Sequence, residues 1–456
     1  MNKPVQLPPA LLSSLQGLPG FSPDAFIATH QAGEQVTSLR LNPRKPIAVG
    51  AGWQPVPWAA NGFYLPERPS FTFDPLFHAG TYYVQEASSM FLEQAIVQHI
   101  PQTDKLRVLD LCAAPGGKST HLQSLLPPGT LLVSNEVIRT RVPVLRDNLV
   151  KWGGDNVVVT QNDPSHFQRL GAWFDIMVVD APCSGSGLFR RDPGAISEWS
   201  ESNVALCAGR QQRILEDCWP ALKEDGLLIY STCSFSREED EAILNWILDT
   251  LPGAEPVALT VPAEWNITST AAAKGGTGYR FWPDKIKGEG FFLACFRKKI
   301  TATELTIKIK QQPEKLNTKE QAMVKHWLQG EDLFLLKQDN RVYAWPADLA
   351  ADMTLLRQQL SMAYSGVLAG EMMRDKMVPD HALAMNLRAS NEIPRIGVDF
   401  ATAIAYLQKK DIQLPEAAKG WQLLCYEDQP LGWVNVLSNR VNNYYPKELR
   451  ILKEHA

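Results

Sequence analysis

Short apolar runs separated by polar, glycine-containing segments mark the middle of the chain. Runs of this length that are hydrophobic throughout are typical of buried parallel strands, which we expect at residues 107–111, 131–133, 157–159, 174–180 and 227–230. Helices are expected at 119–126 and, from apolar periodicity, at 204–222, and a capping box at 236–239 predicts another that begins at Asp240 or just before it. This alternation indicates an α/β fold with a doubly wound parallel sheet.

Polar side chains stand where these strands end. Ligands of an open parallel sheet bind outside the carboxyl ends of its strands, so such side chains are expected to meet in one crevice. The first strand leads through Gly116-Gly117 into a helix, an arrangement whose backbone amides hold the polar tail of a cofactor. Glu136, 20 residues past Gly116, can accept both ribose hydroxyls, and Asn162-Asp163 could meet an adenine. Asp180 closes the fourth strand.

Two cysteines, Cys183 and Cys233, follow the fourth and fifth strands directly. Both thiols are therefore expected to face the same crevice, which suggests covalent chemistry. Methylation of a pyrimidine at carbon 5 requires such chemistry, because a thiolate must first add to carbon 6 and a base must later remove the carbon 5 proton. One cysteine can attack while the other assists release. The other five cysteines are expected to pack as small hydrophobic residues: Cys112, Cys207, Cys218, Cys295 and Cys425.

Three segments resemble the signature motifs of the RNA 5-methylcytosine methyltransferases of the Sun/nucleolar-protein family. They are residues 110–118 (DLCAAPGGK), 180–187 (DAPCSGSG) and 230–234 (YSTCS). Residues 83–89 and 288–292 also match, so the resemblance spans about residues 78–298. It implies a Rossmann-like catalytic domain that uses S-adenosylmethionine as the methyl donor.

The resemblance also assigns roles to individual residues. Cys233 is implied as the nucleophile, Cys183 as the group that promotes release, and Asp180 as the group that holds or protonates the ring edge. Lys118 is expected to orient the ring or the cofactor loop. The cofactor-binding set carried over from the family is Cys112, Ala113, Ala114, Pro115, Gly116, Gly117, Lys118, Glu136, Asp163 and Asp180.

Domain boundaries follow from shifts in composition and from the same resemblance. Residues 1–75 are proline-rich and resemble the small N-terminal α+β RNA-binding domain of these enzymes, and residues 76–299 form the expected catalytic domain. Residues 301–321 are expected to be a linker or an edge. The segment 300–456 resembles the C-terminal extension of the F-type bacterial small-subunit rRNA methyltransferases, which carries a PUA-like RNA-binding module. The implied substrate is a cytosine of 16S rRNA, in free rRNA or in the small ribosomal subunit, with tRNA as the alternative.

Composition modifies this interpretation in one respect. The chain has 456 residues, enough for two or three domains, but its net charge of −4 gives no overall nucleic-acid signature. Local clusters of Lys and Arg, such as Arg40-Arg44-Lys45 and the one at residues 139–151, are expected to be solvated surface. Arg190-Arg191, close behind Cys183, is the better candidate for an RNA contact.

The cysteine content and the hydropathy of the chain indicate where in the cell the protein is located. Seven cysteines without metal-ligand spacing or an even framework predict no metal site and no disulfides, and so a cytoplasmic protein. Residues 1–15 lack the apolar core of a signal peptide, and no apolar run reaches 18 residues, so no membrane association is expected. A monomer is expected.

Two other classes of function remain open at this point. Residues 112–119 differ from a P-loop by one residue, because Cys112 stands where that motif requires glycine, and 176–180 could be its magnesium-binding strand. An NTPase would leave Glu136 and the two strand-end thiols without a role. A catalytically inactive ribosome-assembly protein is the other alternative, but Cys233, Asp180 and Glu136 are all present.

Overall fold

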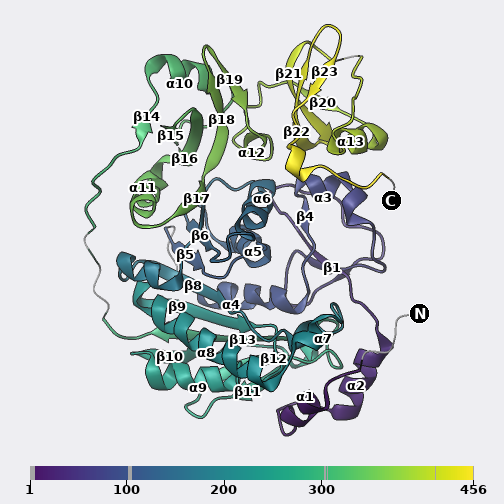
Figure 1. Cartoon of the computed structure of the whole chain (residues 1–456), viewed down its shortest axis with the longest axis vertical. Coiled ribbons are helices and arrows are strands. Elements are labelled where there is room, and N and C mark those ends of the chain that lie inside the picture. The colour runs from purple at the N-terminus through teal and green to yellow at the C-terminus, as the bar shows by residue number, and fades with distance from the viewer. Residues whose placement is uncertain (1–5, 101–104, 302–304, 306, 416, 455–456) are drawn as a thin grey trace.

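The computed structural model describes residues 6–100, 105–301, 305, 307–415 and 417–454, and a parallel sheet lies at its centre (Figure 1). Its five parallel strands have the order β7-β6-β5-β8-β9. They are β5 (Arg107–Asp110), β6 (Leu131–Asn135), β7 (Val157–Thr160), β8 (Phe174–Asp180) and β9 (Leu222–Thr232). The five predicted strands are confirmed, and β9 begins five residues before the predicted start at 227.

Antiparallel strands extend both sides of this sheet to ten strands in all. Next to β9 lie β13 (Phe291–Lys298), then β12 (Thr277–Phe281) and β11 (Thr268–Ala271), and β10 (Ala254–Val257) also pairs with β13. Beyond β7 lies β17 (Met362–Ser365), which belongs to the C-terminal part of the sequence. A segment 200 residues downstream therefore completes the sheet that carries the candidate site.

Helices cover both faces of the sheet, because successive strand residues point to opposite sides. Val108, Leu132 and Ile229 pack on one face with α4 (Leu92–His99), α5 (Gly117–Leu125) and α6 (Val142–Trp152). Leu109, Val133 and Leu228 pack on the other face with α8 (Glu201–Cys218), α9 (Glu241–Thr250) and α11 (Ala350–Gln359). The short helix α7 (Ala195–Glu198) precedes α8. The predicted doubly wound α/β fold is thus confirmed.

Two predicted helix limits differ from the structure. The helix expected at 204–222 spans Glu201–Cys218, because Pro220 lacks the amide hydrogen and the freedom that a continuing helix needs. The predicted capping box at 236–239 is wrong: α9 begins at Glu241, and the Ser236 hydroxyl has no partner. The Glu239 carboxylate turns instead toward the loop after β8.

The N-terminal part forms a separate four-stranded sheet with the order β2-β3-β1-β4. Its strands are β1 (Ser38–Leu41), β2 (Gln54–Pro55), β3 (Gly62–Tyr64) and β4 (Tyr82–Tyr83), and its helices are α1 (Pro9–Ser14), α2 (Pro23–Ala32) and α3 (Pro75–Ala79). Strand β4 lies past residue 75, where we expected the first boundary. The division of the chain into three domains stays a prediction.

The C-terminal part contains two further sheets. The first has the order β14-β15-β16-β18-β19 and consists of β14 (Glu314–Lys315), β15 (Leu333–Gln338), β16 (Arg341–Pro346), β18 (Val367–Met373) and β19 (Lys376–Pro379), with α10 (Thr318–Lys325) and α12 (His381–Ala384). The second consists of β20 (Arg395–Gly397), β21 (Gly420–Tyr426), β22 (Gln429–Val436) and β23 (Val441–Asn443), with α13 (Phe400–Leu407). In the expected linker 301–321, β14 is an edge strand, whereas 302–304 and 306 lie outside the described residues.

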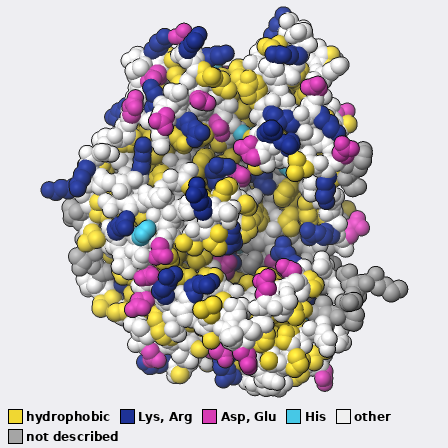
Figure 2. Space-filling model, viewed as in Figure 1, with side chains coloured by type: hydrophobic (Ala, Val, Ile, Leu, Met, Phe, Trp, Pro, Cys, Tyr) yellow, Lys and Arg dark blue, Asp and Glu magenta, His cyan; other side chains and the backbone are white. Residues whose placement is uncertain are grey.

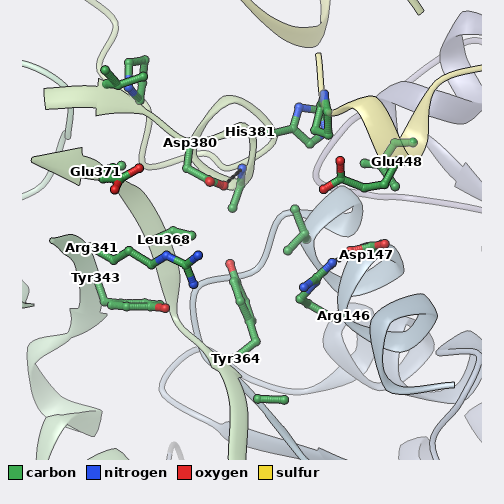
Figure 3. Close-up of a pocket in the computed structure, with 18 residues that line it drawn as sticks. Arg146, Asp147, Arg341, Tyr343, Tyr364, Leu368, Glu371, Asp380, His381 and Glu448 are labelled. Carbon is green, nitrogen blue, oxygen red and sulfur yellow. Dashed lines mark hydrogen bonds and ion pairs between the residues drawn. The ribbon is translucent and has the colours of Figure 1, made fainter. Parts of the chain in front are cut away.

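The N-terminal and C-terminal parts pack together beside the catalytic sheet. Phe73 and Ala79 share a hydrophobic cluster with Tyr406 and Leu431 of the last sheet region. A cavity of about 320 Å³ lies between α6, the first C-terminal sheet and residues 446–449, with the Arg341 side chain directed toward Tyr364 (Figure 3). As far as the structure is described, none of the predicted site residues lines this cavity.

Two further properties concern the whole molecule. Lys and Arg side chains on the face shown in Figure 2 are interspersed with Asp and Glu, so this face has no single basic patch. Among the described residues, no helix combines the length and the apolar character needed to cross a membrane.

Candidate active site

The candidate site lies where the strand order of the central sheet reverses. Strand β5 has β6 on one side and β8 on the other, so the loops that leave their carboxyl ends diverge and open a crevice. The predicted residues follow the ends of β5, β6, β7, β8 and β9, and Figure 1 shows these strands side by side. The topology therefore brings the predicted residues to one edge of the sheet.

The loop after β5 leads into α5 through Gly116, which has a φ of +110°. Residues with a side chain rarely adopt this conformation, so the turn requires glycine. Asp110, at the end of β5, accepts a hydrogen bond of 2.6 Å from the Ser119 hydroxyl to its Oδ2, while its Oδ1 has no partner. Complete burial raises the pKa of Asp110 to about 7. Asp110 thus holds α5 against β5.

Arg40 fixes the same helix from the N-terminal sheet. Its guanidinium donates to the Gln85 side chain (3.0 Å), the Gly117 carbonyl (3.2 Å) and the Thr120 hydroxyl (2.7 Å). The expectation of solvated surface is therefore wrong for Arg40, and also for Lys45, whose ammonium group donates to two buried backbone carbonyls. Buried charges of this kind persist only when oxygen atoms satisfy their hydrogens.

Glu136 follows β6 and is buried. Its Oε1 accepts a hydrogen bond of 2.8 Å from the Ile138 amide, and its Oε2 lies 3.4 Å from Arg141 Nη1. Arg141 also donates to the Ala114 carbonyl at 2.5 Å, so it joins the loop after β5 to Glu136. Arg141 belongs to the cluster that we expected to be simple solvated surface; its exposed side chain nevertheless makes these two contacts.

Asn135 is a site residue that the sequence interpretation missed. Its Oδ1 accepts hydrogen bonds from the Thr160 hydroxyl and the Asn162 amide, both at 2.9 Å, and its Nδ2 donates to the Leu111 carbonyl at 3.1 Å. It therefore ties together the ends of β5, β6 and β7. The available sequence signal was a polar residue at the end of an apolar run, directly before Glu136.

Asp163 follows β7 and begins a short 3-10 helix, η3 (Pro164–Leu170). Its Oδ1 accepts hydrogen bonds from the Ser165 hydroxyl (2.7 Å) and amide (3.1 Å), which lower the pKa of its carboxyl. Its Oδ2 lies 4.0 Å from an Arg213 nitrogen. The carboxylate therefore has its own local partners at the outer rim of the crevice.

Asp180 and Lys118 form an ion pair inside the crevice, with 2.7 Å between Nζ and Oδ2. The Ser231 hydroxyl donates to the other Asp180 oxygen at 2.8 Å, and Lys118 Nζ lies 5.1 Å from the centre of the Phe291 ring. Four strands or helices, β8, α5, β9 and β13, thus contribute to this group. This fixed charge pair lies at the ends of the two strands that lead to the thiols, where it can orient a polar heterocycle.

The two strand-end thiols lie next to each other. The distance from Cys183 Sγ to Cys233 Sγ is 3.1 Å, and both side chains are half-buried. The hydrogen bond with Cys233, together with burial, raises the pKa of the Cys183 thiol. The expectation that both sulfurs meet in one place agrees with this geometry. Cys207, Cys218, Cys295 and Cys425 are buried, as expected, and Cys112 is partly buried against the hydrophobic core.

Arg190 is not available for RNA, contrary to the expectation for Arg190-Arg191. It is buried and donates to the carbonyls of Gly288 (3.0 Å) and Glu34 (2.5 Å), with Glu289 3.9 Å away. Arg190 therefore joins the loop after Cys183 to its neighbours, and only Arg191 is exposed. In the part of the chain that the structure describes, no three His, Cys, Asp or Glu side chains form a group that could hold a metal ion.

Three family models match the chain. The model for 16S rRNA methyltransferase RsmB/F matches residues 97–297, the model for the N-terminal domain of 16S rRNA methyltransferase RsmF matches 7–87, and the model for the methyltransferase RsmF PUA domain matches 394–451. These matches cover the central sheet apart from β17, the N-terminal sheet and the last C-terminal sheet.

Individual relatives agree with the family models. Ribosomal RNA small subunit methyltransferase F of Shewanella loihica is 31% identical over 428 residues, 87% of this chain and 84% of the relative. The protein of the same name from Vibrio vulnificus is 29% identical over 98% of both chains. A solved methyltransferase homolog protein from Pyrococcus horikoshii is 31% identical, with a TM-score of 0.50 over 64% of this chain and 100% of that one. On this sequence similarity and this shared fold, the chain belongs to the family of the ribosomal RNA small subunit methyltransferases F.

Proposed function

We propose that Cys233, Cys183, Asp180 and Lys118 carry out the methylation of carbon 5 of a cytosine in 16S rRNA. The protein is an S-adenosylmethionine-dependent rRNA methyltransferase, and we infer that it works through a covalent bond between a cysteine and the cytosine. The observation that carries the assignment of residues is the 3.1 Å contact between the two thiols, beside the Lys118–Asp180 ion pair.

The attack step requires a nucleophile and a group on the ring edge. The Cys233 thiolate forms a bond to carbon 6, and the electron pair of the 5,6 double bond makes carbon 5 nucleophilic. Asp180 holds the polar edge of the ring, which orients carbon 6 for this addition. Lys118 keeps the Asp180 carboxyl in place. S-adenosylmethionine, when bound, supplies the methyl group as an electrophile.

The release step requires a base. Cys183 removes the carbon 5 proton, the double bond re-forms, and the bond between carbon 6 and the Cys233 sulfur breaks. A raised pKa suits this role: Cys183 keeps its proton during the attack, gives it up to solvent once the Cys233 sulfur is bonded to carbon 6, and its thiolate is then the stronger base. The two sulfurs lie close enough to act on adjacent ring carbons.

The residues that would hold S-adenosylmethionine fit its chemistry. Glu136 is the carboxylate for the ribose hydroxyls, and Asp163 lies where the adenine would be. The backbone from Cys112 to Gly117 and the N-terminus of α5 would hold the amino-acid end, whose charged groups also suit Asp180. The unpartnered Oδ1 of Asp110 is a buried acceptor beside this loop.

The wider setting of the reaction follows from the substrate. We infer that the N-terminal and C-terminal parts position structured rRNA over the crevice, and that the protein acts in the cytoplasm as a monomer without a metal ion. A cytosine in a duplex would have to be flipped out to reach the thiols. The three-domain division at about residues 75 and 299 belongs to the same proposal.

Bisulfite mapping of rRNA and tRNA from a deletion strain tests this function. We expect one or more 16S rRNA cytosines to lose their methylation and to regain it with the wild-type gene but not with Cys233→Ala. Loss in tRNA alone would replace rRNA as the substrate. Calorimetry gives a second test, because tight ATP binding without any heat from S-adenosylmethionine would favour the NTPase.

A further inference from the structure

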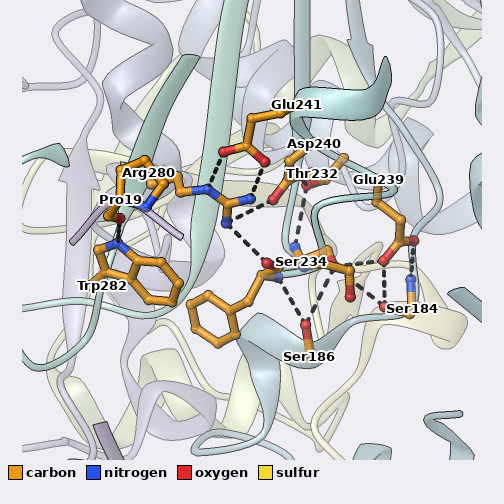
Figure 4. Close-up of polar contacts among 12 residues, drawn as sticks. Pro19, Ser184, Ser186, Thr232, Ser234, Glu239, Asp240, Glu241, Arg280 and Trp282 are labelled. Carbon is orange, nitrogen blue, oxygen red and sulfur yellow. Dashed lines mark hydrogen bonds and ion pairs between the residues drawn. The ribbon is translucent and has the colours of Figure 1, made fainter. Parts of the chain in front are cut away.

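A buried network of polar contacts joins the two loops that carry the thiols (Figure 4). The Gly187 amide donates to the Cys233 carbonyl at 2.9 Å, and the Phe235 amide donates to the Ser186 hydroxyl at 2.9 Å. The central member is the carboxylate of Glu239, which is completely buried. The function proposed above uses none of these side chains.

Glu239 contacts the residue that follows each cysteine. Ser184, next to Cys183, donates its amide to Oε1 (2.7 Å) and its hydroxyl to Oε2 (2.5 Å). Ser234, next to Cys233, donates its hydroxyl to the same Oε2 at 2.6 Å. One carboxylate thus spans both loops, one residue away from each sulfur.

The position of Glu239 is itself fixed. Gln211 of α8 donates to Oε1 at 3.3 Å, and the Tyr230 hydroxyl donates to the Glu239 carbonyl at 2.6 Å. The residues after it hold the start of α9, because Arg280 contacts Asp240 (3.1 Å) and Glu241 (2.5 Å). These contacts with α8, β9 and β12 therefore hold the Glu239 backbone and carboxylate in place.

Four hydrogen-bond donors point at the Glu239 carboxyl oxygens: the Ser184 amide, the Ser184 and Ser234 hydroxyls and the Gln211 side-chain NH2 group. A carboxylate satisfies this set, since each oxygen can accept two hydrogen bonds. Glutamine fits the set less well, because its NH2 group would donate to the two serine hydroxyl oxygens and the hydroxyl hydrogens would then lose their buried acceptor. The site thus favours a carboxylate of this length.

We propose that Glu239 is a positioning residue that holds the Cys183 and Cys233 loops at the separation on which the two-thiol reaction depends. The inference rests on the proposed function for its catalytic consequence. The geometric part of the proposal, that Glu239 sets the distance between the two sulfurs, does not depend on that function. A displacement of about 1 Å at reacting groups can cost about 10²-fold in rate, so a small shift of either loop is sufficient.

The geometric part is tested with Glu239→Gln and with Glu238→Gln as the matched control, an exposed residue with the same side chain one position earlier. The separation of the two sulfurs is probed with the oxidant diamide, which contains an N=N bond. When diamide oxidises two adjacent thiols, the sulfurs form one bond, and their two protons and two electrons pass to the N=N bond to give a hydrazine. We expect the Cys183–Cys233 disulfide to form about tenfold more slowly in Glu239→Gln, relative to alkylation of the same thiols by iodoacetamide. The control should match the wild type. Equal rates in all three proteins would overturn the proposal.

The catalytic part is tested by single-turnover methylation of 16S rRNA. We expect the rate to fall about 10²-fold in Glu239→Gln, while the affinity for S-adenosylmethionine and the KM for RNA stay within about twofold, because the residues that would bind the cofactor lie on other loops. If Glu239→Gln does not fold, Ser184→Ala with Ser234→Ala removes the two hydroxyl contacts of the four and is measured in the same way. An unchanged rate with slower disulfide formation would overturn the catalytic role of the spacing.

The two measurements separate the two proposals. Slower disulfide formation in Glu239→Gln, with no methylation of any RNA by the wild type, would remove the proposed function and leave Glu239 as the group that spaces the thiols. Methylation by the wild type together with unchanged disulfide formation and activity in Glu239→Gln would leave the function and remove the positioning role.

Discussion

At the scale of single residues, the two thiols are distinguished by what surrounds them. The pKa of Cys183 is raised by its hydrogen bond with Cys233, by burial and by the nearby charge of Glu239. A thiol that resists ionisation is better suited to a later proton transfer than to the first attack. The assignment of Cys233 as the nucleophile comes from the resemblance to the family.

Substitution of each cysteine separates their roles. Cys233→Ala should abolish methylation and form no covalent RNA adduct, because carbon 5 is never activated. Cys183→Ala should attack and transfer the methyl group, then stall with methylated RNA attached to Cys233. A denaturing gel of enzyme with RNA and S-adenosylmethionine would show the adduct as a slowly migrating band. A band from Cys233→Ala and none from Cys183→Ala would reverse the assignment.

Glu136 should determine affinity for the cofactor. Glu136→Ala removes a charged acceptor of two hydrogen bonds, and we expect binding of S-adenosylmethionine to weaken by about 1.5 to 3 kcal/mol. Calorimetry measures this directly, and Glu201→Ala, at the exposed start of α8, is the control. An affinity equal to that of the control would remove Glu136 from the binding site.

Asp110 should make the stability of the protein depend on pH. Its folded pKa of about 7 lies above its ordinary value of 3.8, so its contribution to stability is fully present below about pH 4 and is lost as the pH rises toward 7. Asp110→Asn, which cannot ionise, should therefore gain stability relative to the wild type between pH 4 and 7. Melting temperatures of both proteins across this range test the prediction, and a constant difference would contradict it.

At the scale of elements, the C-terminal part belongs to the architecture of the cofactor site. Strand β17 pairs with β7, and the Ser361 carbonyl just before it accepts from the Gln161 amide (2.9 Å) and the Asn162 side chain (3.1 Å). On the other face, Arg107 of β5 makes a two-point ion pair with Asp352 of α11, at 2.8 and 2.9 Å. The crevice therefore depends on residues far downstream in the sequence.

Removal of residues 300–456 should consequently affect more than RNA binding. We expect the shortened protein to lose affinity for rRNA and also to melt at a lower temperature and bind S-adenosylmethionine more weakly, because β7 becomes an edge strand and the apolar faces of α11 and β17 are lost. Thermal unfolding and calorimetry measure both effects. Unchanged stability and cofactor affinity would show that the catalytic part is self-sufficient.

At the scale of the whole molecule, the net charge is −4, and on the face shown in Figure 2 Lys and Arg alternate with Asp and Glu. We therefore expect RNA contacts to come from separate positions rather than from one basic patch on this face. The last sheet region carries exposed cations on several segments, among them Arg395, Lys419 and Arg440. We infer that the enzyme recognises the shape of folded rRNA with few phosphate contacts.

The salt dependence of binding tests this inference. Replacing Arg395, Lys419 and Arg440 by alanine should weaken rRNA binding and reduce the slope of log K against log salt by about 0.7 to 0.9 for each phosphate contact that is lost. Lys274→Ala, on the turn between β11 and β12, is the control. A slope equal to that of the control would place the RNA contacts elsewhere. Filter binding at several salt concentrations provides the measurement.

The sequence by itself determined the local chemistry of this protein. Apolar runs located the five parallel strands, because a strand buried on both faces must be hydrophobic throughout, and their order along the chain put polar residues at one edge of the sheet. Cys183 and Cys233 could be placed together for this reason. The charged residues Arg40, Lys45 and Arg190 could not be placed, since a cation that donates to buried carbonyls looks the same in sequence as one in solvent.

Only the tertiary structure decided which distant segments complete the site. Nothing in the sequence indicates that β17 pairs with β7, because the pairing of an edge strand depends on the packing of the whole domain and not on the neighbouring residues in the chain. For the same reason, Ser236 and Glu239 resembled a helix cap in sequence. In the folded protein the carboxylate of Glu239 accepts four hydrogen bonds from Ser184, Ser234 and Gln211, and these outweigh a local cap.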